Sequence, residues 1–128
     1  MANDKIIPIG KKNPNLPFHP AVRAGDFIFV SGQVPKDENG NMCGDSSIEV
    51  QTRWTLESIK RVLAEAGAEM SDVVKVVTYI EDARNFSRYN GVFKEYFPEG
   101  KLARTTVECR LAIDCMIEMD AVAYKPKG

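Results

Sequence analysis

A strict alternation of side-chain character near the end of the chain constrains the fold most. From Ala103 to Tyr124 the sequence reads ARTTVECRLAIDCMIEMDAVAY. Successive side chains of a β-strand point to opposite faces, so a period of two indicates strands. The pattern predicts two neighbouring strands joined by a short turn, which share one apolar and one charged face. The charged face is predicted to carry Arg104, Thr106, Glu108, Arg110, Glu118 and Asp120.

Two helices and three further strands are predicted upstream of this region, with two of the strands before the first helix. The β-branched and aromatic run at residues 27–33 is typical of a strand, as is the valine-rich run at residues 72–81. A capping box at residues 46–49 predicts the start of a helix that Gly67 ends. Aromatic residues at helical spacing predict a second helix over residues 86–97.

The length and the order of these elements predict the fold class. A chain of 128 residues suffices for one domain, and residues 1–25, with four of the seven prolines, are predicted to form an extended arm before the fold proper. The remainder predicts an α/β (α+β) arrangement in which both helices cover one face of a mixed sheet. The other face would then lack an internal partner, and we expect it to carry Arg104 and Glu118.

Composition and charge exclude several classes of function. The formal net charge of −1 offers no basic excess for nucleic acid. No window approaches the roughly 18 apolar residues of a membrane span, and the N-terminus lacks the apolar core of a secretory signal, so we expect a cytoplasmic protein. A zinc site is disfavoured because the three cysteines form no CxxC pair and His19 is the only histidine.

The uncovered sheet face has two interpretations. An antiparallel sheet can expose one polar face to water. Here, however, the bulky side chains of Met116, Val122 and Tyr124 interrupt the polar face. A mixture of apolar and ionic groups is more typical of an interface between subunits, which favours a homo-oligomer.

Four segments in order resemble the Rid/YjgF family of reactive-intermediate deaminases across residues 16–126. They read FIFVSGQVP, QTRWTLESIKRVLAEAGAEMSDVVKVVTYIED, YNGVFKEYF and ARTTVECRLAIDCMIEMDAVAYKP. The resemblance implies a chorismate-mutase-like domain, three subunits whose sheets close into a central barrel, and active sites between subunits. It also implies cofactor-free hydrolysis of enamines and imines, such as 2-aminoacrylate, to 2-oxo acids and ammonia.

The resemblance also implies roles for individual residues. Arg104 matches the arginine that binds the substrate carboxylate, a role suited to a guanidinium because it stays charged and binds carboxylates bidentately. Glu118 matches the glutamate that orients or activates the attacking water. Ser31 and Gly32 match a pair at a strand end that holds substrate or water, and Asn90 matches an asparagine near the site.

The chain departs from the family pattern at three places. Phe18 stands where many members have a tyrosine, so this pocket residue offers no hydroxyl. Thr106 replaces a cysteine two residues after Arg104 and leaves a hydroxyl in place of the thiol. The link from Arg104 to Glu118 is about one residue shorter than usual. These departures are compatible with deamination and leave open another substrate.

Several alternatives remain open from the sequence alone. The chain could be a catabolic deaminase of one larger enamine, such as 2-aminomuconate, or a trimeric metabolite-binding or chaperone-like protein without turnover. Ribonuclease activity, attached to names in this family, is disfavoured by the single histidine and the absence of a basic stripe. Arg104 could also be half of a surface ion pair, and Glu118 could pair with Arg110 across the predicted hairpin.

Overall fold

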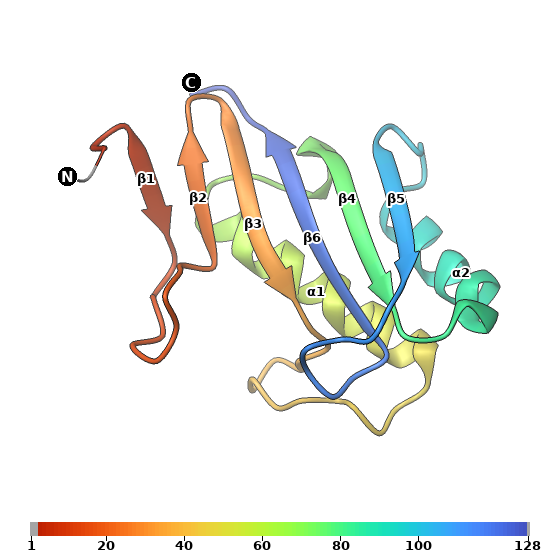
Figure 1. Cartoon of the computed structure of the whole chain (residues 1–128). Helices are drawn as coiled ribbons and strands as arrows, with labels where there is room; N and C mark the ends of the chain where they lie inside the picture. Colours follow the sequence, from red (N-terminus) through yellow and green to blue (C-terminus); the bar gives the residue numbers. More distant parts are fainter. Residues whose placement is uncertain (1–2, 128) are drawn as a thin grey trace.

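The computed structural model describes residues 3–127, which fold into a six-stranded sheet with two helices on one face (Figure 1). The predicted fold class is confirmed. The strands lie in the order β1-β2-β3-β6-β4-β5. The elements are β1 (Ile6–Ile9), β2 (Ala21–Ala24), β3 (Phe27–Gln33), α1 (Ile48–Glu65), β4 (Val73–Ile80), α2 (Phe86–Tyr96), β5 (Ala103–Glu108) and β6 (Ile117–Tyr124), with 3-10 turns at Met70–Asp72 and Ala83–Asn85.

The last two strands do not form the predicted hairpin. β4 lies between them, pairing antiparallel with β6 on one side and parallel with β5 on the other. Parallel neighbours cannot be joined by a tight turn, so the connection from β4 to β5 runs through α2, and β5 becomes the outer strand. Glu118 is therefore directly opposite Tyr79 of β4, and it does not face Arg110 across a hairpin.

The N-terminal arm is also part of the fold. β1 and β2 extend the sheet beyond β3, so the prediction that the fold proper starts after residue 25 is wrong. Both strands are only four residues long, and β1 contains Pro8. Proline is tolerated there because β1 is an edge strand. In a sequence, however, proline argues against a strand, which is why β1 was not predicted.

The core lies between the sheet and the two helices. Leu56, Ile59 and Leu63 of α1 are fully buried, as are Val76 and Met119 of the sheet. Complete burial of each such side chain contributes about 1.5–3 kcal/mol to the stability of the fold.

Helix α1 starts with Ser47 as its N-cap, one residue later than the predicted capping box. The Ser47 hydroxyl accepts a hydrogen bond from the Val50 N–H at 3.2 Å.

No element of the described part of the chain covers the opposite face of the sheet, as the sequence predicts (Figure 1). Large apolar side chains lie exposed on it: Phe27 and Phe29 of β3, Val107 of β5 and Tyr124 of β6. The rings of Phe27 and Tyr124 are in contact, with 5.2 Å between their centroids.

Within residues 3–127, neither helix has the length and apolar character needed to cross a membrane.

Candidate active site

Arg104 and Glu118 lie on opposite faces of the sheet, which corrects the prediction that they share one. Arg104 is opposite Val76, whose side chain is buried under the helices. Glu118 is opposite Tyr79, three residues further along β4, and an odd offset reverses the face. Glu118 therefore belongs to the uncovered face and Arg104 to the covered one. We call their surroundings the acidic half-site and the cationic half-site.

The cationic half-site is built by α2 and β5. The central guanidinium carbon of Arg104 lies 4.7 Å from the ring centroid of Phe93, 4.8 Å from Tyr89 and 5.6 Å from Phe86. These rings recur every three or four residues and therefore share one side of the helix. Cation–π attraction to three rings allows a charged residue to occupy the covered face of an edge strand, where the alternation predicts an apolar residue.

Arg104 has no acidic partner within residues 3–127. Its side chain instead borders a hollow of about 510 Å³, which Asn90, Phe93 and Lys94 also line. The structure thus brings Asn90 together with Arg104. A guanidinium with no carboxylate beside it retains its N–H donors for an incoming anion.

Thr106 lies on the same face as Arg104 and takes part in a buried hydroxyl network. The Tyr89 hydroxyl donates to Thr78 Oγ1 at 2.7 Å and lies 2.9 Å from Thr106 Oγ1. Because Tyr89 has only one hydroxyl proton, Thr106 donates to Tyr89 when Tyr89 donates to Thr78. Thr106 therefore anchors the ring beneath Arg104.

The acidic half-site is centred on Glu118, which is partly buried on the uncovered face. Burial raises the pKa of the Glu118 carboxyl above its ordinary value, and the negative charge of Asp120 raises it further. Glu118 has no ion-pair partner in the described part of the chain. Its carboxylate therefore holds a proton more readily than an exposed glutamate does.

Gly32 provides the space that the Glu118 side chain occupies. It lies where the pairing of β3 with β6 is irregular, between Val30 and Gln33. A Cβ atom added at Gly32 would overlap the Glu118 carboxylate. The close approach of backbone and carboxylate thus requires a residue without a side chain at this position.

Ser31 ties the segment before β2 to the end of β3. Its hydroxyl donates to the His19 carbonyl at 2.7 Å, and its backbone N–H donates to the Pro20 carbonyl at 2.9 Å. The hydroxyl proton is therefore engaged inside the chain, and the Ser31 oxygen can only accept a further hydrogen bond.

A hollow of about 440 Å³ leads to Glu118 from the outside. Phe18, Ser31 and Gly32 line it, so these predicted residues are brought together with Glu118. Leu16 adds a further apolar side chain to the wall. Phe18 is half-exposed at its edge. In this chain, then, Phe18, Ser31, Gly32 and Glu118 form one group, while Asn90, Arg104 and Thr106 form another.

Two residues that the sequence analysis gave no role also adjoin Glu118. Tyr79 and Asp120 line a second hollow beside Glu118, of about 220 Å³. The Tyr79 hydroxyl donates to the Asp120 carboxylate at 3.0 Å, which raises the pKa of Tyr79. The alternation along β4 could have predicted that Tyr79 and its neighbour, the buried Thr78, point to opposite faces of the sheet. Only the strand order shows that Tyr79 lies beside Glu118.

No group of three or more metal-ligating side chains occurs among residues 3–127.

With two helices over one face of a mixed sheet and an uncovered opposite face, the domain has the chorismate-mutase-like architecture. The chain belongs to the Rid/YjgF family, because the family model described as Endoribonuclease L-PSP matches residues 10–125.

Relatives of known name or structure extend this similarity along the whole chain. A RutC family protein of Pyrococcus abyssi is 44% identical over 126 residues, which are 98% of this chain and 99% of the relative. The 3-aminoacrylate deaminase RutC of Acinetobacter baylyi is 36% identical over 125 residues, covering 97% and 99% of the two chains. Among solved structures, the Rid family protein YyfA of Yersinia pestis superposes with a TM-score of 0.83 at 31% identity, covering 93% of this chain and 98% of its own.

Proposed function

We propose that the protein hydrolyses reactive enamines and imines of the 2-aminoacrylate type to 2-oxo acids and ammonia. The observation that carries this proposal is Arg104, a cation seated on three aromatic rings with no acidic partner among residues 3–127. Such a group is suited to bind the carboxylate of a small 2-imino acid. The similarity to a protein named 3-aminoacrylate deaminase supports the same chemistry.

Arg104 would fix the substrate through its carboxylate. A planar guanidinium forms two parallel hydrogen bonds to a carboxylate and holds it in one orientation. Cation–π contacts do not use the N–H donors of the guanidinium edge, so the aromatic rings hold Arg104 without competing for the substrate. Orientation of this kind lowers the entropic part of the barrier.

Glu118 would direct the water. As the water oxygen bonds to the C=N carbon, a water proton passes to the Glu118 carboxylate. Glu118 then returns this proton to the nitrogen, which gives a carbinolamine. Glu118 next takes the hydroxyl proton of the carbinolamine and passes it to the nitrogen, so that the C–N bond breaks and ammonia leaves as the carbonyl forms. No electrons are gained or lost overall. A carboxylate whose pKa is raised by burial and by Asp120 is better matched to these successive proton transfers than an ordinary glutamate.

The two half-sites would act together only across an interface. Because Arg104 and Glu118 lie on opposite faces, one small substrate does not reach both within one chain. We propose a homotrimer in which Arg104 of one copy meets Glu118 of the next. The exposed apolar side chains of the uncovered sheet face, Phe27, Phe29 and Tyr124 among them, support an interface there.

A larger enamine is the second candidate substrate. The hollow at Glu118, of about 440 Å³, exceeds the needs of a three-carbon imine, and Leu16 and Phe18 give it an apolar wall. We do not propose ribonuclease activity, which the description of the family model names. The net charge of −1 gives the chain little attraction for a phosphate backbone.

The direct test generates 2-aminoacrylate in place with a coupled dehydratase and measures ammonia and pyruvate release. We expect the wild type to exceed the spontaneous rate and both Arg104→Ala and Glu118→Ala to fall to background. A conservative Arg104→Lys variant should recover little, because an ammonium cannot bind the carboxylate bidentately. A wild type that is stabilised by 2-oxo acids yet releases no extra ammonia from small or large imines would be a binding protein, and the proposal would be wrong.

A further inference from the structure

We propose that Tyr79 and Asp120 form a positioning pair that acts through Glu118. In this pair the Tyr79 hydroxyl fixes the Asp120 carboxylate, and the charge of Asp120 keeps Glu118 able to take up and release a proton during turnover. The inference rests on the proposed function. It assigns two residues of the uncovered face a role in that reaction without direct contact with the substrate.

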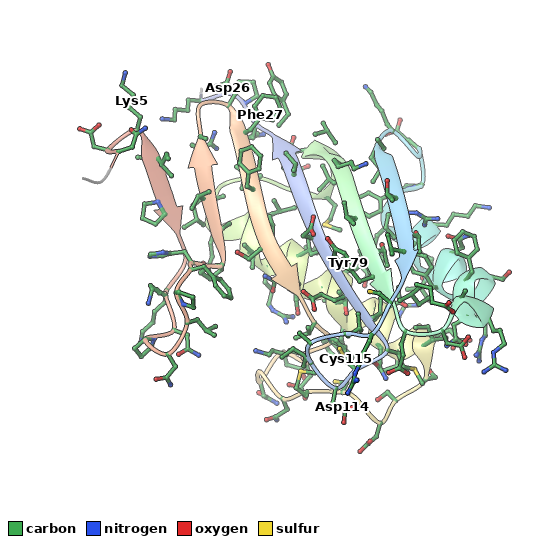
Figure 2. The ribbon with its side chains drawn as sticks, viewed as in Figure 1. Lys5, Asp26, Phe27, Tyr79, Asp114 and Cys115 are labelled. Atoms are coloured by element: carbon green, nitrogen blue, oxygen red, sulfur yellow. The ribbon has the colours of Figure 1, made fainter. Side chains whose placement is uncertain are left out.

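The sheet register places the pair beside Glu118. Tyr79 of β4 is directly opposite Glu118 of β6, and Asp120 follows Glu118 by two residues on the same face. Tyr79 is labelled in Figure 2, near the middle of the sheet in a view with the helices behind it. All three side chains line the hollow of about 220 Å³. The three groups therefore face one another from two paired strands.

The hydrogen bond between Tyr79 and Asp120 decides which group acts on Glu118. Tyr79 has a single hydroxyl proton and donates it to Asp120 at 3.0 Å. It therefore does not donate to Glu118, whose lone pairs remain available for water. What reaches Glu118 is the negative charge of Asp120, held at a fixed place by the tyrosine.

Other charged or titratable groups also face Glu118. Cys109 and Arg110, in the connection after β5, line the smaller hollow, and Lys11 and Lys36 line the larger one. None of these three cations forms an ion pair with Glu118. Asp120 is the charged neighbour that raises the pKa of Glu118, in addition to burial. Removal of this one charge should therefore change the titration of Glu118.

The experiment compares Asp120→Asn and Tyr79→Phe with a matched control, Asp26→Asn. Asparagine retains the size of aspartate and can still accept from Tyr79. Asp26 lies at the turn between β2 and β3, at the far end of the sheet from Cys115 and Asp114 (Figure 2). Two readouts are used: the pH dependence of kcat/KM, and the carboxyl titration of Glu118 followed by carbon-13 NMR, with Glu118→Gln to assign the signal.

Loss of the Asp120 charge lowers the pKa of Glu118. In Asp120→Asn we therefore expect the acid limb of the pH profile and the NMR titration to move together to lower pH. In Tyr79→Phe, where Asp120 keeps its charge and loses its anchor, we expect a smaller shift in the same direction and a several-fold loss of kcat. Asp26→Asn should match the wild type in both readouts.

The inference is wrong if the Glu118 carboxyl titrates at the same pH in Asp120→Asn as it does in the wild type and in Asp26→Asn. It is also wrong if Tyr79→Phe changes neither kcat nor the Glu118 titration, and this variant decides the matter if Asp120→Asn does not fold. The NMR titration requires no turnover. If the deaminase proposal alone fails, ammonia release by the wild type stays at the spontaneous rate, while the Glu118 titration still shifts in Asp120→Asn.

Discussion

The cationic and acidic half-sites control charge in different ways. Arg104 lies against three aromatic rings on the covered side of an edge strand, whereas Glu118 lies beside Asp120 on the uncovered face. The rings attract the guanidinium cation of Arg104, while burial and a like charge destabilise the charged form of Glu118. Neither group has an opposite charge bound to it within residues 3–127. The two half-sites thus differ in how they control charge, and the proposed homotrimer would bring them together.

The largest effect should come from combining two inactive variants. If the site joins Arg104 of one copy to Glu118 of the next, co-expressed Arg104→Ala and Glu118→Ala chains form some sites in which both residues are intact. Random mixing in a cyclic trimer restores about a quarter of the sites. The measurement is ammonia release from 2-aminoacrylate by the co-purified mixture. Activity that stays at background in verified mixed trimers would place both residues of each site in one chain.

The next largest effect concerns Gly32. In Gly32→Ala the new methyl group occupies the space of the Glu118 carboxylate, so the carboxylate must move. We expect kcat/KM to fall by about 10- to 100-fold, as displacement of a reacting group by about 1 Å can do. The melting temperature should change little, because the end of a flexible side chain can move aside.

A double-mutant cycle provides the control for this prediction. In a Glu118→Ala background, Gly32→Ala should cost no further activity, because the group that it displaces is already absent. An equal loss in both backgrounds would mean that Gly32 acts through its backbone and not through Glu118.

The smallest effect tests the aromatic side of the comparison. Phe86 is half-exposed, so Phe86→Leu should leave the fold intact while removing one of the three rings at Arg104. A cation–π contact at a partly exposed site contributes about 0.5–1 kcal/mol, which predicts a two- to fivefold rise in KM with kcat nearly unchanged. Phe86→Tyr, which retains a ring, should behave as the wild type. If Phe86→Tyr and Phe86→Leu raise KM equally, the aromatic face of residue 86 does not hold Arg104 in place.

The regular, buried parts of the fold could be predicted from the sequence. The spacing of Leu56, Ile59 and Leu63 indicates a helix because all three must face the core, and the alternation from Ile117 to Met119 marks β6 for the same reason. A densely packed core restricts each of these elements to one spacing of apolar residues. A four-residue edge strand such as β1 buries few side chains, so it has no clear apolar alternation, and the prolines in and after it hide the strand in the sequence.

The face on which Arg104 lies could not be predicted in the same way. In β5 the apolar residue Val107 faces the uncovered side and Arg104 faces the helix, the reverse of an ordinary amphipathic strand. The aromatic rings of α2 make this reversal possible, and their position depends on the parallel crossover. The resemblance assigned Asn90, Arg104, Gly32 and Glu118 to one site, and it could not show that they lie in two groups on opposite faces within one chain.

The crossover through α2 also affects how the two half-sites are lost on heating. The cationic half-site is made by α2 and β5 within residues 86–106, one continuous stretch of chain, whereas the acidic half-site needs β3, β6 and the segment around Phe18 to come together. The hydrogen bond from Ser31 to the His19 carbonyl links that segment to β3. Local opening of β1 and β2 breaks this link without disturbing Arg104. Hydrogen exchange should therefore show the acidic half-site opening first, at a lower free energy than global unfolding.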